Sequence, residues 1–231
     1  MESIMQKMDA PEWFTTYADM RSDTYVMLAA LLGLPPSEDL LGVLQNLEWP
    51  QATPEPLSNA LEALRQAGQN TSLGAMKDEF NRLFIGLGTG EMVPYASWYK
   101  EKKIQSLPLA SLRSSLLELG ILRQAGSHES EDHAGALCEI MALISRQSNP
   151  IPLPVQANFF QRHIASWIIA FFEDLRLVKD ASFYSVVGLF GSRFMELEHK
   201  YMNLGEHTPF PIKTRRIQNG NKSIRRQTGV Y

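Results

Sequence analysis

The chain has 231 residues, of which 44% are hydrophobic and 20% are charged, a composition that is ordinary for a globular protein. Its single cysteine excludes an internal disulfide and fits a reducing compartment, and the N-terminus lacks the apolar core of a secretory signal. The most apolar run, "IASWIIAFF", is much shorter than the roughly 20 residues that span a membrane. We therefore expect a cytoplasmic protein with no stable membrane insertion.

The net charge of -3 combines an acidic body with a basic C-terminal tail. After Glu206 there is no acid, and six of the 22 basic residues lie there: Lys213, Arg215, Arg216, Lys222, Arg225 and Arg226. The remaining 16 basic residues face 25 acidic ones in 1–206, a balance of -9. An acidic body disfavours nucleic-acid binding and suits a cationic partner.

Apolar residues recur at intervals of three and four along most of the chain, which is the period of an amphipathic helix. The pattern predicts helices over 12–32, over 54–67 with Thr53 as N-cap and an end at Gly68, over about 71–84, and over 107–119. Neither a strand pattern nor a repeat is evident. The predicted fold class is therefore all-α, a compact helical bundle.

Between two of these helices, "GLGTGEMVPYASWY" reads as a loop, because Gly86, Gly88 and Gly90 interrupt the helical period. The loop carries three aromatic residues, Tyr95, Trp98 and Tyr99. Aromatic side chains in a loop either wedge back into the fold or form a binding surface, and the sequence leaves both possibilities open.

The segment "SHESEDHAGALCEIM", residues 127–141, holds two histidines, four carboxylates and the only cysteine. It predicts a helix that begins near Ser130 as N-cap, with Glu131 and Asp132 at the positive end of the helix dipole and Cys138 as packing. A metal site is the alternative, but Asp132 and His133 are adjacent and diverge by about 100° on a helix, so they do not converge on one ion. The helix start is the favoured interpretation.

The Pro-rich segment 148–155, "SNPIPLPV", is predicted to be a stiff non-helical hinge. Two long helices are expected after it, one carrying Phe160 to Leu175 and the other carrying Phe183 to Tyr201. Residues 206–231 lack an apolar face, so we expect a single domain over 1–205 and a flexible basic tail over 206–231.

Four segments in order resemble the TorD/DmsD family of redox enzyme maturation chaperones: "EFNRLFIG" with a short Gly-rich loop; "PYASWY"; an acid-x-x-Asp-His element that opens a helix; and the pair "FFQRHIASWIIAFF" and "SFYSVVGLFGSRFMELE". The resemblance covers roughly 12–203. It implies a cytoplasmic all-α chaperone without catalytic activity. Such a chaperone binds the twin-arginine signal peptide of a molybdenum-containing oxidoreductase, holds it back from export until the cofactor is inserted, and contacts the catalytic subunit.

The resemblance also implies binding residues, namely Leu83, Phe84, Pro94, Tyr95, Ser97, Tyr99, Asp132 and His133. Leu87 and Ser130 depart from the family, which often has proline at both places. The chemistry of the residues supports the same site. Glu131 and Asp132 would receive guanidinium groups of the peptide. Trp98 would join the apolar lining formed by Leu83, Phe84 and Tyr95. His133 would orient Asp132 or add a pH dependence.

The alternative function is a metal- or nucleotide-dependent helical enzyme that uses Asp132, His133 and the Gly86–Gly90 loop. The chain lacks a G-x-S-x-G elbow, and the Gly-rich loop lacks the Lys-Ser/Thr of a P-loop. We expect no cofactor beyond the weak guanine-nucleotide binding of some family members. The expected oligomeric state is a monomer or a dimer swapped through the hinge.

Overall fold

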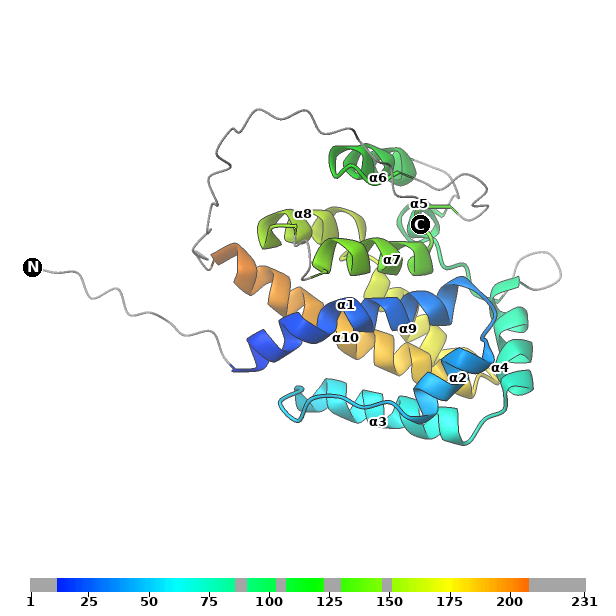
Figure 1. The fold of residues 1–231 in the computed structure, drawn as a ribbon. Coiled ribbons are helices and arrows are strands. Elements are labelled where there is room, and N and C mark those ends of the chain that lie inside the picture. Colours follow the sequence, from blue (N-terminus) through cyan, green and yellow to red (C-terminus); the bar gives the residue numbers. More distant parts are fainter. Residues whose placement is uncertain (1–11, 86–90, 103–106, 123–129, 147–150, 208–231) are drawn as a thin grey trace, which may run out of the picture.

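The computed structural model describes residues 12–85, 91–102, 107–122, 130–146 and 151–207 (Figure 1). Within these ranges the chain forms ten α-helices and one π-helical turn, and it forms no strand, which confirms the predicted all-α class. In chain order the elements are α1 (Glu12–Gly33), α2 (Glu38–Gln45), α3 (Glu55–Gln69), α4 (Leu73–Phe80), η1 (Asn81–Ile85), α5 (Ala96–Glu101), α6 (Leu107–Glu118), α7 (Ala134–Ser145), α8 (Leu153–His163), α9 (Ile168–Leu177) and α10 (Phe183–His207). None of the described helices is long and apolar enough to cross a membrane.

The core forms around α1 and α10, which pass through the middle of the bundle (Figure 1). The last helix, α10, packs against α9, α3, α8, α4 and α1, while α7 packs along α1. Aromatic side chains fill the crossing, where the rings of Tyr25 and Phe194 meet edge to face with centroids 4.8 Å apart. Burial of these large apolar surfaces is the main stabilising contribution to such a bundle.

A charged pair is buried inside this crossing. Glu198 of α10 is fully buried and accepts hydrogen bonds from Arg21 Nε at 2.7 Å, Tyr17 Oη at 2.7 Å and Tyr25 Oη at 2.6 Å. Arg21 also donates to Gln156 Oε1 of α8 at 3.0 Å. With Arg21 Nη2, which donates to the other Glu198 oxygen at 3.0 Å, four donors satisfy a carboxylate that would be costly to bury alone. The network therefore ties the first helix to two of the last three.

The Pro-rich hinge and the helices after it differ from the prediction. Residues 147–150 lie outside the described part, but Leu153 already begins α8, with Pro152 as N-cap, so the non-helical prediction was wrong for 153–155. The expected single helix over 160–175 is also two helices, so three helices follow the hinge. The helix is interrupted between His163 and Ile168. There Trp167 Nε1 donates to the His163 carbonyl at 2.8 Å, and in a continuous helix that carbonyl would accept from the backbone N–H of Trp167.

Several helix boundaries also differ. The N-cap of α3 is Pro54 instead of Thr53, and the helix continues past Gly68, where the missing side chain lets α2 approach. The short helices α2 and α5 were not predicted, although Ser37 caps α2 by accepting from Leu40 N at 3.2 Å. The last helix extends to His207, two residues into the expected tail. The remaining tail residues, 208–231, lie outside the described part.

Candidate functional site

The helix start in the His- and acid-rich segment lies three residues later than predicted. α7 begins at Ala134, and its N-cap is His133, whose Nδ1 accepts from Gly135 N at 3.0 Å. Because Nδ1 is an acceptor, it carries no proton, and the imidazole can stand at the positive end of the helix. Ser130 is not the cap, since its hydroxyl donates to Asp132 Oδ1 at 2.6 Å.

Five of the predicted binding residues are brought together by a short bridge between 94–97 and 132–134. Ala134 N donates to the Pro94 carbonyl at 2.7 Å, and Ala96 N donates to the Asp132 carbonyl at 2.9 Å. The rings of Tyr95 and His133 meet edge to face at 5.2 Å. The bridge joins the start of α5 to the start of α7.

Asp132 and Ser97 face the inside of this bridge. Asp132 is 1% exposed, and its second oxygen accepts from Ser97 N at 3.0 Å, so both carboxylate oxygens are already bonded within the chain. Ser97 is fully buried, and its hydroxyl has no hydrogen-bond partner among the described residues. In this conformation the Asp132 carboxylate holds the start of α5 beside the start of α7, and its burial keeps it from contact with a ligand in solvent.

The other predicted aromatic and apolar residues are spread over the core and α5. Leu83 is fully buried, and Phe84 packs against Phe80 and Tyr184 at 5.1 and 5.4 Å between ring centroids. Trp98 and Tyr99 lie on α5, so the loop prediction was wrong for them. Tyr99 donates to Asp174 of α9 at 2.8 Å, while Trp98 remains 36% exposed.

A groove lies between α6, α7 and the end of α1, and its volume is about 820 Å³. In the view of Figure 1, α7 lies between α6 and α1. The groove holds four strongly exposed leucines, whose exposed fractions are 74% for Leu34, 67% for Leu117, 75% for Leu122 and 46% for Leu143. Such a cluster of exposed large apolar side chains is unusual for a surface that stays in water.

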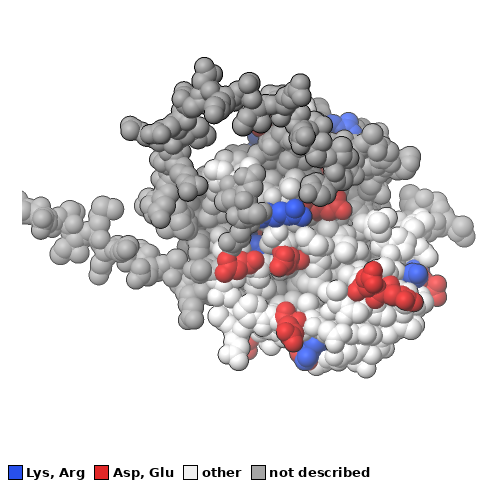
Figure 2. Space-filling model, in the orientation of Figure 1, with Lys and Arg blue, Asp and Glu red and all other residues white. Residues whose placement is uncertain are grey.

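Charged side chains complete the groove lining. Glu131 and Glu139 line it, and Arg113 of α6 binds both Glu131 oxygens, at 2.9 and 3.1 Å. The hydrogen bonds that Arg113 donates to the Glu131 carboxylate raise the pKa of the Arg113 guanidinium above its ordinary value. Only Glu131 and His133 of the ten predicted residues line this groove. Across the face shown in Figure 2, acidic side chains outnumber basic ones and lie in separate patches.

Sequence reasoning missed the leucines of the groove. The run "SLLELGIL" in 115–122 has more leucines than one helix face can bury, so Leu116 is buried while Leu117 and Leu122 are exposed. This excess of leucines was the feature of the sequence that could have predicted an exposed apolar surface. The close approach of α7 to α1 was also not predictable from the sequence pattern. It depends on Gly135, where an added Cβ would lie 3.1 Å from Gly33 N.

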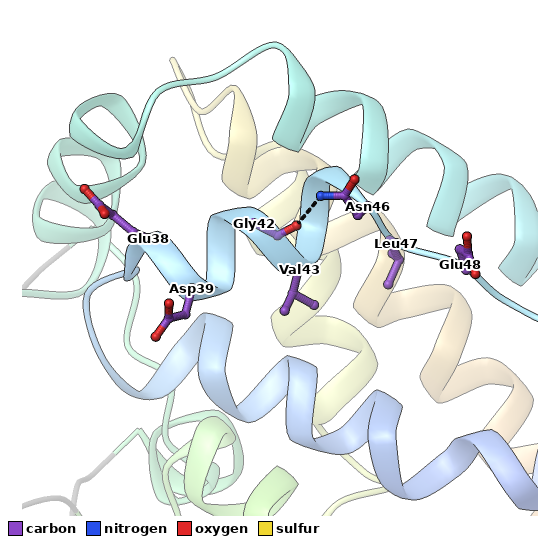
Figure 3. Close-up of a pocket in the computed structure, with 7 residues that line it drawn as sticks. All are labelled: Glu38, Asp39, Gly42, Val43, Asn46, Leu47 and Glu48. Carbon is purple, nitrogen blue, oxygen red and sulfur yellow. Dashed lines mark hydrogen bonds between the residues drawn. The ribbon is translucent and has the colours of Figure 1, made fainter.

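A second, more open depression of about 690 Å³ lies along α2 (Figure 3). Glu38 and Asp39 lie at one end of it and Glu48 at the other, with Val43 between them. Asn46 Nδ2 donates to the Gly42 carbonyl at 2.9 Å, which closes the last turn of the helix. This depression belongs almost entirely to one short helix, and none of its residues was predicted.

Within the described ranges, no group of three or more His, Cys, Asp or Glu side chains is placed to hold a metal ion. The Gly86–Gly90 loop, invoked for nucleotide binding, lies outside those ranges. Cys138 is buried in α7, and burial raises the pKa of its thiol well above the usual value, as expected of a packing residue.

The comparison with known families identifies the chain. A sequence model of the family described as nitrate reductase delta subunit matches residues 49–173, which is more than half of the chain and includes α6, α7 and the bridge. The chain belongs to this family, the family of the TorD chaperones. As a TorD-type protein it is a redox enzyme maturation chaperone, and chaperones of this family partner with redox enzyme subunits.

Individual relatives agree with this membership. The chaperone protein TorD of Vibrio cholerae is 25% identical over 171 residues, which cover 69% of this chain and 77% of that protein. The TorD of Histophilus somni is 24% identical over 110 residues, 47% of this chain and 55% of that one. A crystal structure of a protein assigned to redox enzyme maturation, from Archaeoglobus fulgidus, superposes with a TM-score of 0.52 at 18% identity, over 77% of this TorD-family chain and 94% of that one. This last likeness concerns the fold alone.

Proposed function

We propose that this chaperone works in the cytoplasm and binds the twin-arginine signal peptide of a molybdenum-containing oxidoreductase. It holds the peptide back from export until the cofactor is inserted, and it contacts the catalytic subunit. The observation that carries this proposal is the groove between α6 and α7, which places carboxylates beside exposed leucines. A twin-arginine signal peptide has the complementary chemistry, a cationic pair followed by an apolar stretch.

The groove-facing side chains of α7 follow the helical repeat. Ala136, Glu139, Ile140 and Leu143 recur at intervals of three and four, so they form one stripe along the groove floor. The leucines of α6 face this stripe from the other side. An apolar peptide segment laid between them would cover side chains that water now contacts, as in helix-in-groove recognition.

The cationic pair of the peptide would bind at the acidic edge. Glu139 is exposed, while Glu131 is held by Arg113, so an incoming arginine binds Glu139 and exchanges with Arg113 at Glu131. Arginine suits this exchange because its planar guanidinium can form two parallel hydrogen bonds to a carboxylate, which lysine cannot.

The buried bridge residues take a supporting role in this proposal. Pro94, Ser97 and Asp132 fix the start of α7 and thereby the position of Glu131 and His133 in the groove. Direct peptide contacts at Leu83, Phe84, Tyr95, Trp98 and Tyr99 stay predictions of the family resemblance. The weak guanine-nucleotide binding of some members likewise stays a prediction.

Titration calorimetry with a synthetic twin-arginine peptide tests the proposal. Glu139→Gln should weaken binding about 10- to 100-fold, because it removes one charge-assisted hydrogen bond worth roughly 1.5–3 kcal/mol. Glu118→Gln is the matched control, since Glu118 lies exposed on α6 outside the groove. Leu143→Ser should weaken binding, whereas Leu177→Ser, at an exposed leucine outside the groove, should not.

A peptide with both arginines changed to lysine should bind the wild-type protein more weakly. Binding that is equally tight for Glu139→Gln and Glu118→Gln would show that the groove is not the site. Absence of any binding by the wild type would contradict the function itself.

A further inference from the structure

The C-terminal tail carries its cations in pairs. Arg215 and Arg216 are followed by Ile217, and Arg225 and Arg226 are preceded by Ile224. No acidic residue accompanies them. Each pair therefore presents two guanidinium groups next to a branched apolar side chain, which is a small version of the chemistry that the groove would recognise.

The groove is complementary to such a segment. Glu131 and Glu139 supply the negative charge, and Leu117 and Leu122 supply exposed apolar surface within the same cavity. The rest of the body is acidic as well, with the balance of -9 over 1–206. A basic tail is thus attracted to the body as a whole and finds both kinds of contact only where carboxylates and leucines adjoin.

Contacts between helices connect the end of α10 to α6 through α8. Asn203, near the end of α10, accepts from Gln161 Nε2 of α8 at 3.1 Å. On the same helix, His163 Nε2 lies 2.9 Å from the hydroxyl of Ser115 of α6. Ser115 adjoins Leu116, which lines the groove. The tail therefore leaves the body beside α8 and the N-terminal half of α1, where the rings of Tyr201 and Tyr17 lie 5.3 Å apart, and it has to run along the body to reach the groove at the other end of α1.

The tail is also long enough. An extended chain covers about 3.3–3.6 Å per residue, so Arg216 can lie up to about 30 Å from His207 and Arg226 up to about 65 Å. A folded body of about 190 residues has a radius of gyration of about 16 Å, and its opposite faces are about 40 Å apart. The second pair can therefore reach any point of the surface, and the first pair can reach the near face.

We propose that residues 213–226 occupy the α6–α7 groove of their own chain and act as an internal competitor for the signal peptide. The identity of the displaced ligand rests on the proposed function; the docking of the tail rests on the groove and the tail sequence. A client peptide then binds only by displacing the tail, so the empty chaperone does not expose its leucines and carboxylates to unrelated cationic peptides.

The expected size of the effect follows from tethering. A short flexible tether gives an effective concentration in the millimolar range. If the tail alone binds the groove with a Kd of about 0.1–1 mM, it occupies the groove about 50–90% of the time, and the apparent affinity for a competing peptide falls about 2- to 10-fold.

The test uses the full-length protein with Arg215, Arg216, Arg225 and Arg226 all changed to Gln. This variant should bind a twin-arginine peptide about 2- to 10-fold more tightly than the wild type. Changing Lys213 and Lys222 to Gln, which lowers the tail charge but keeps both arginine pairs, should have a smaller effect. Both variants keep the body unchanged, and equal melting temperatures would confirm that.

A second measurement observes the tail directly. A fluorescent peptide of residues 208–231 should bind the four-Gln protein, and adding Glu139→Gln should weaken that binding while Glu118→Gln should not.

If the four-Gln variant and the wild type bind the twin-arginine peptide equally, or if the tail peptide does not bind, the tail proposal is wrong and the proposed function stands. If the tail peptide binds but the twin-arginine peptide does not, the proposed function fails and the tail site stands. If light scattering shows that the wild type forms dimers and the four-Gln variant does not, the tail binds the groove of a second chain, and the proposal that it binds its own chain is wrong.

Discussion

At Glu198 a single carboxylate connects both ends of the described chain. Burial first, and then the neighbouring carboxylate, raises the pKa of Tyr17 and of Tyr25 well above the ordinary value, so both phenols stay protonated donors. Burial opposes the charge on Arg21, but Glu198 outweighs it and raises the pKa of that guanidinium. The pair stays charged inside the core because each group stabilises the other.

We expect Glu198→Gln to lower the free energy of unfolding by about 3–5 kcal/mol, because it leaves the buried Arg21 without a counter-charge. Tyr25→Phe removes one donor from an otherwise satisfied carboxylate and should cost only about 1–2 kcal/mol. Urea denaturation of the two variants measures the difference. Similar losses for both would indicate that charge pairing contributes little.

The structure predicts that Asp132 stabilises the fold, whereas its motif suggested that it binds a peptide. Asp132→Asn replaces one acceptor oxygen by an amide nitrogen, so either Ser97 N or the Ser130 hydroxyl loses its acceptor, and stability should fall by about 1.5–3 kcal/mol. Ser97→Ala, which removes a hydroxyl that has no partner among the described residues, should be neutral or stabilising by up to about 1 kcal/mol. Thermal unfolding tests both, and an Asp132→Asn protein as stable as the wild type would argue that the carboxylate serves a ligand instead of the fold.

The buried His163 should make stability depend on pH. Burial first, and then Arg162 and Lys100, lowers its pKa from 6.5 to about 4. Between these values the unfolded chain takes up a proton and the folded chain does not, so this residue stabilises the fold above pH 6.5 and the contribution is lost as the pH falls towards 4. The loss should not exceed about 3 kcal/mol, and His163→Gln should flatten the stability curve in that range. Unfolding at several pH values gives the comparison, in which an unchanged slope would contradict the assignment.

At the scale of elements, helix existence was predictable wherever an apolar stripe ran for three or more turns. The stripes of α1 and α10 are long enough that burial decides the conformation. The short helices α2 and α5 have too few turns to show a period, and the break between α8 and α9 depends on one indole that competes for a carbonyl. Apolar spacing alone does not reveal such a side-chain hydrogen bond.

The candidate site was predictable in its parts and not in its arrangement. The segments around Pro94 and Asp132 were both assigned to the binding region, and the structure joins them by backbone hydrogen bonds. Whether Asp132 faces solvent or the protein interior depends on the turn from Ser130 to His133, and a pattern of residue types does not specify that turn. The exposed leucines of the groove come from α6, from α7 and from the residues that follow α1 and α6, so only the three-dimensional structure could bring them together.

The crossing of α9 and α10 requires glycine at Gly188, which faces the backbone of α9, and at Gly191, which faces the Phe172 ring. A Cβ added at Gly188 would lie 2.7 Å from the Phe172 carbonyl oxygen and 2.8 Å from Arg176 Cα, both backbone atoms that cannot move aside cheaply. We expect Gly188→Ala to destabilise the protein by about 2–4 kcal/mol through the strain of overpacking. Gly42→Ala is the matched control, because Gly42 is also helical but has nothing within 4 Å, and it should stabilise by up to about 1 kcal/mol. Calorimetric melting of the two variants would contradict the packing argument if Gly188→Ala behaved like Gly42→Ala.

On the scale of the whole molecule, the Pro-rich segment separates α1–α7 from α8–α10, although the core mixes helices from both parts. The Arg21–Glu198 pair and the packing of α10 on α3 both cross this boundary. An exchange of α8–α10 between two chains would keep these contacts and place them between protomers, which is the requirement for a swapped dimer.

We therefore expect a monomer together with a dimer whose fraction rises after refolding at high concentration. Size-exclusion chromatography with light scattering measures both species. A single monomer at every loading concentration, before and after refolding, would contradict the prediction.

The central position of α10 also has a consequence for how the protein is made. Glu198 lies 177 residues after Arg21, and at a synthesis rate of about 5–20 residues per second it emerges about 10–35 s later. During that interval the inner faces of α1 and α3 lack the helix that covers them, and Arg21 lacks its carboxylate. The nascent chaperone is thus itself an incomplete protein with exposed apolar surface until its last helix has been translated, and premature termination anywhere before α10 leaves a chain that cannot close its core.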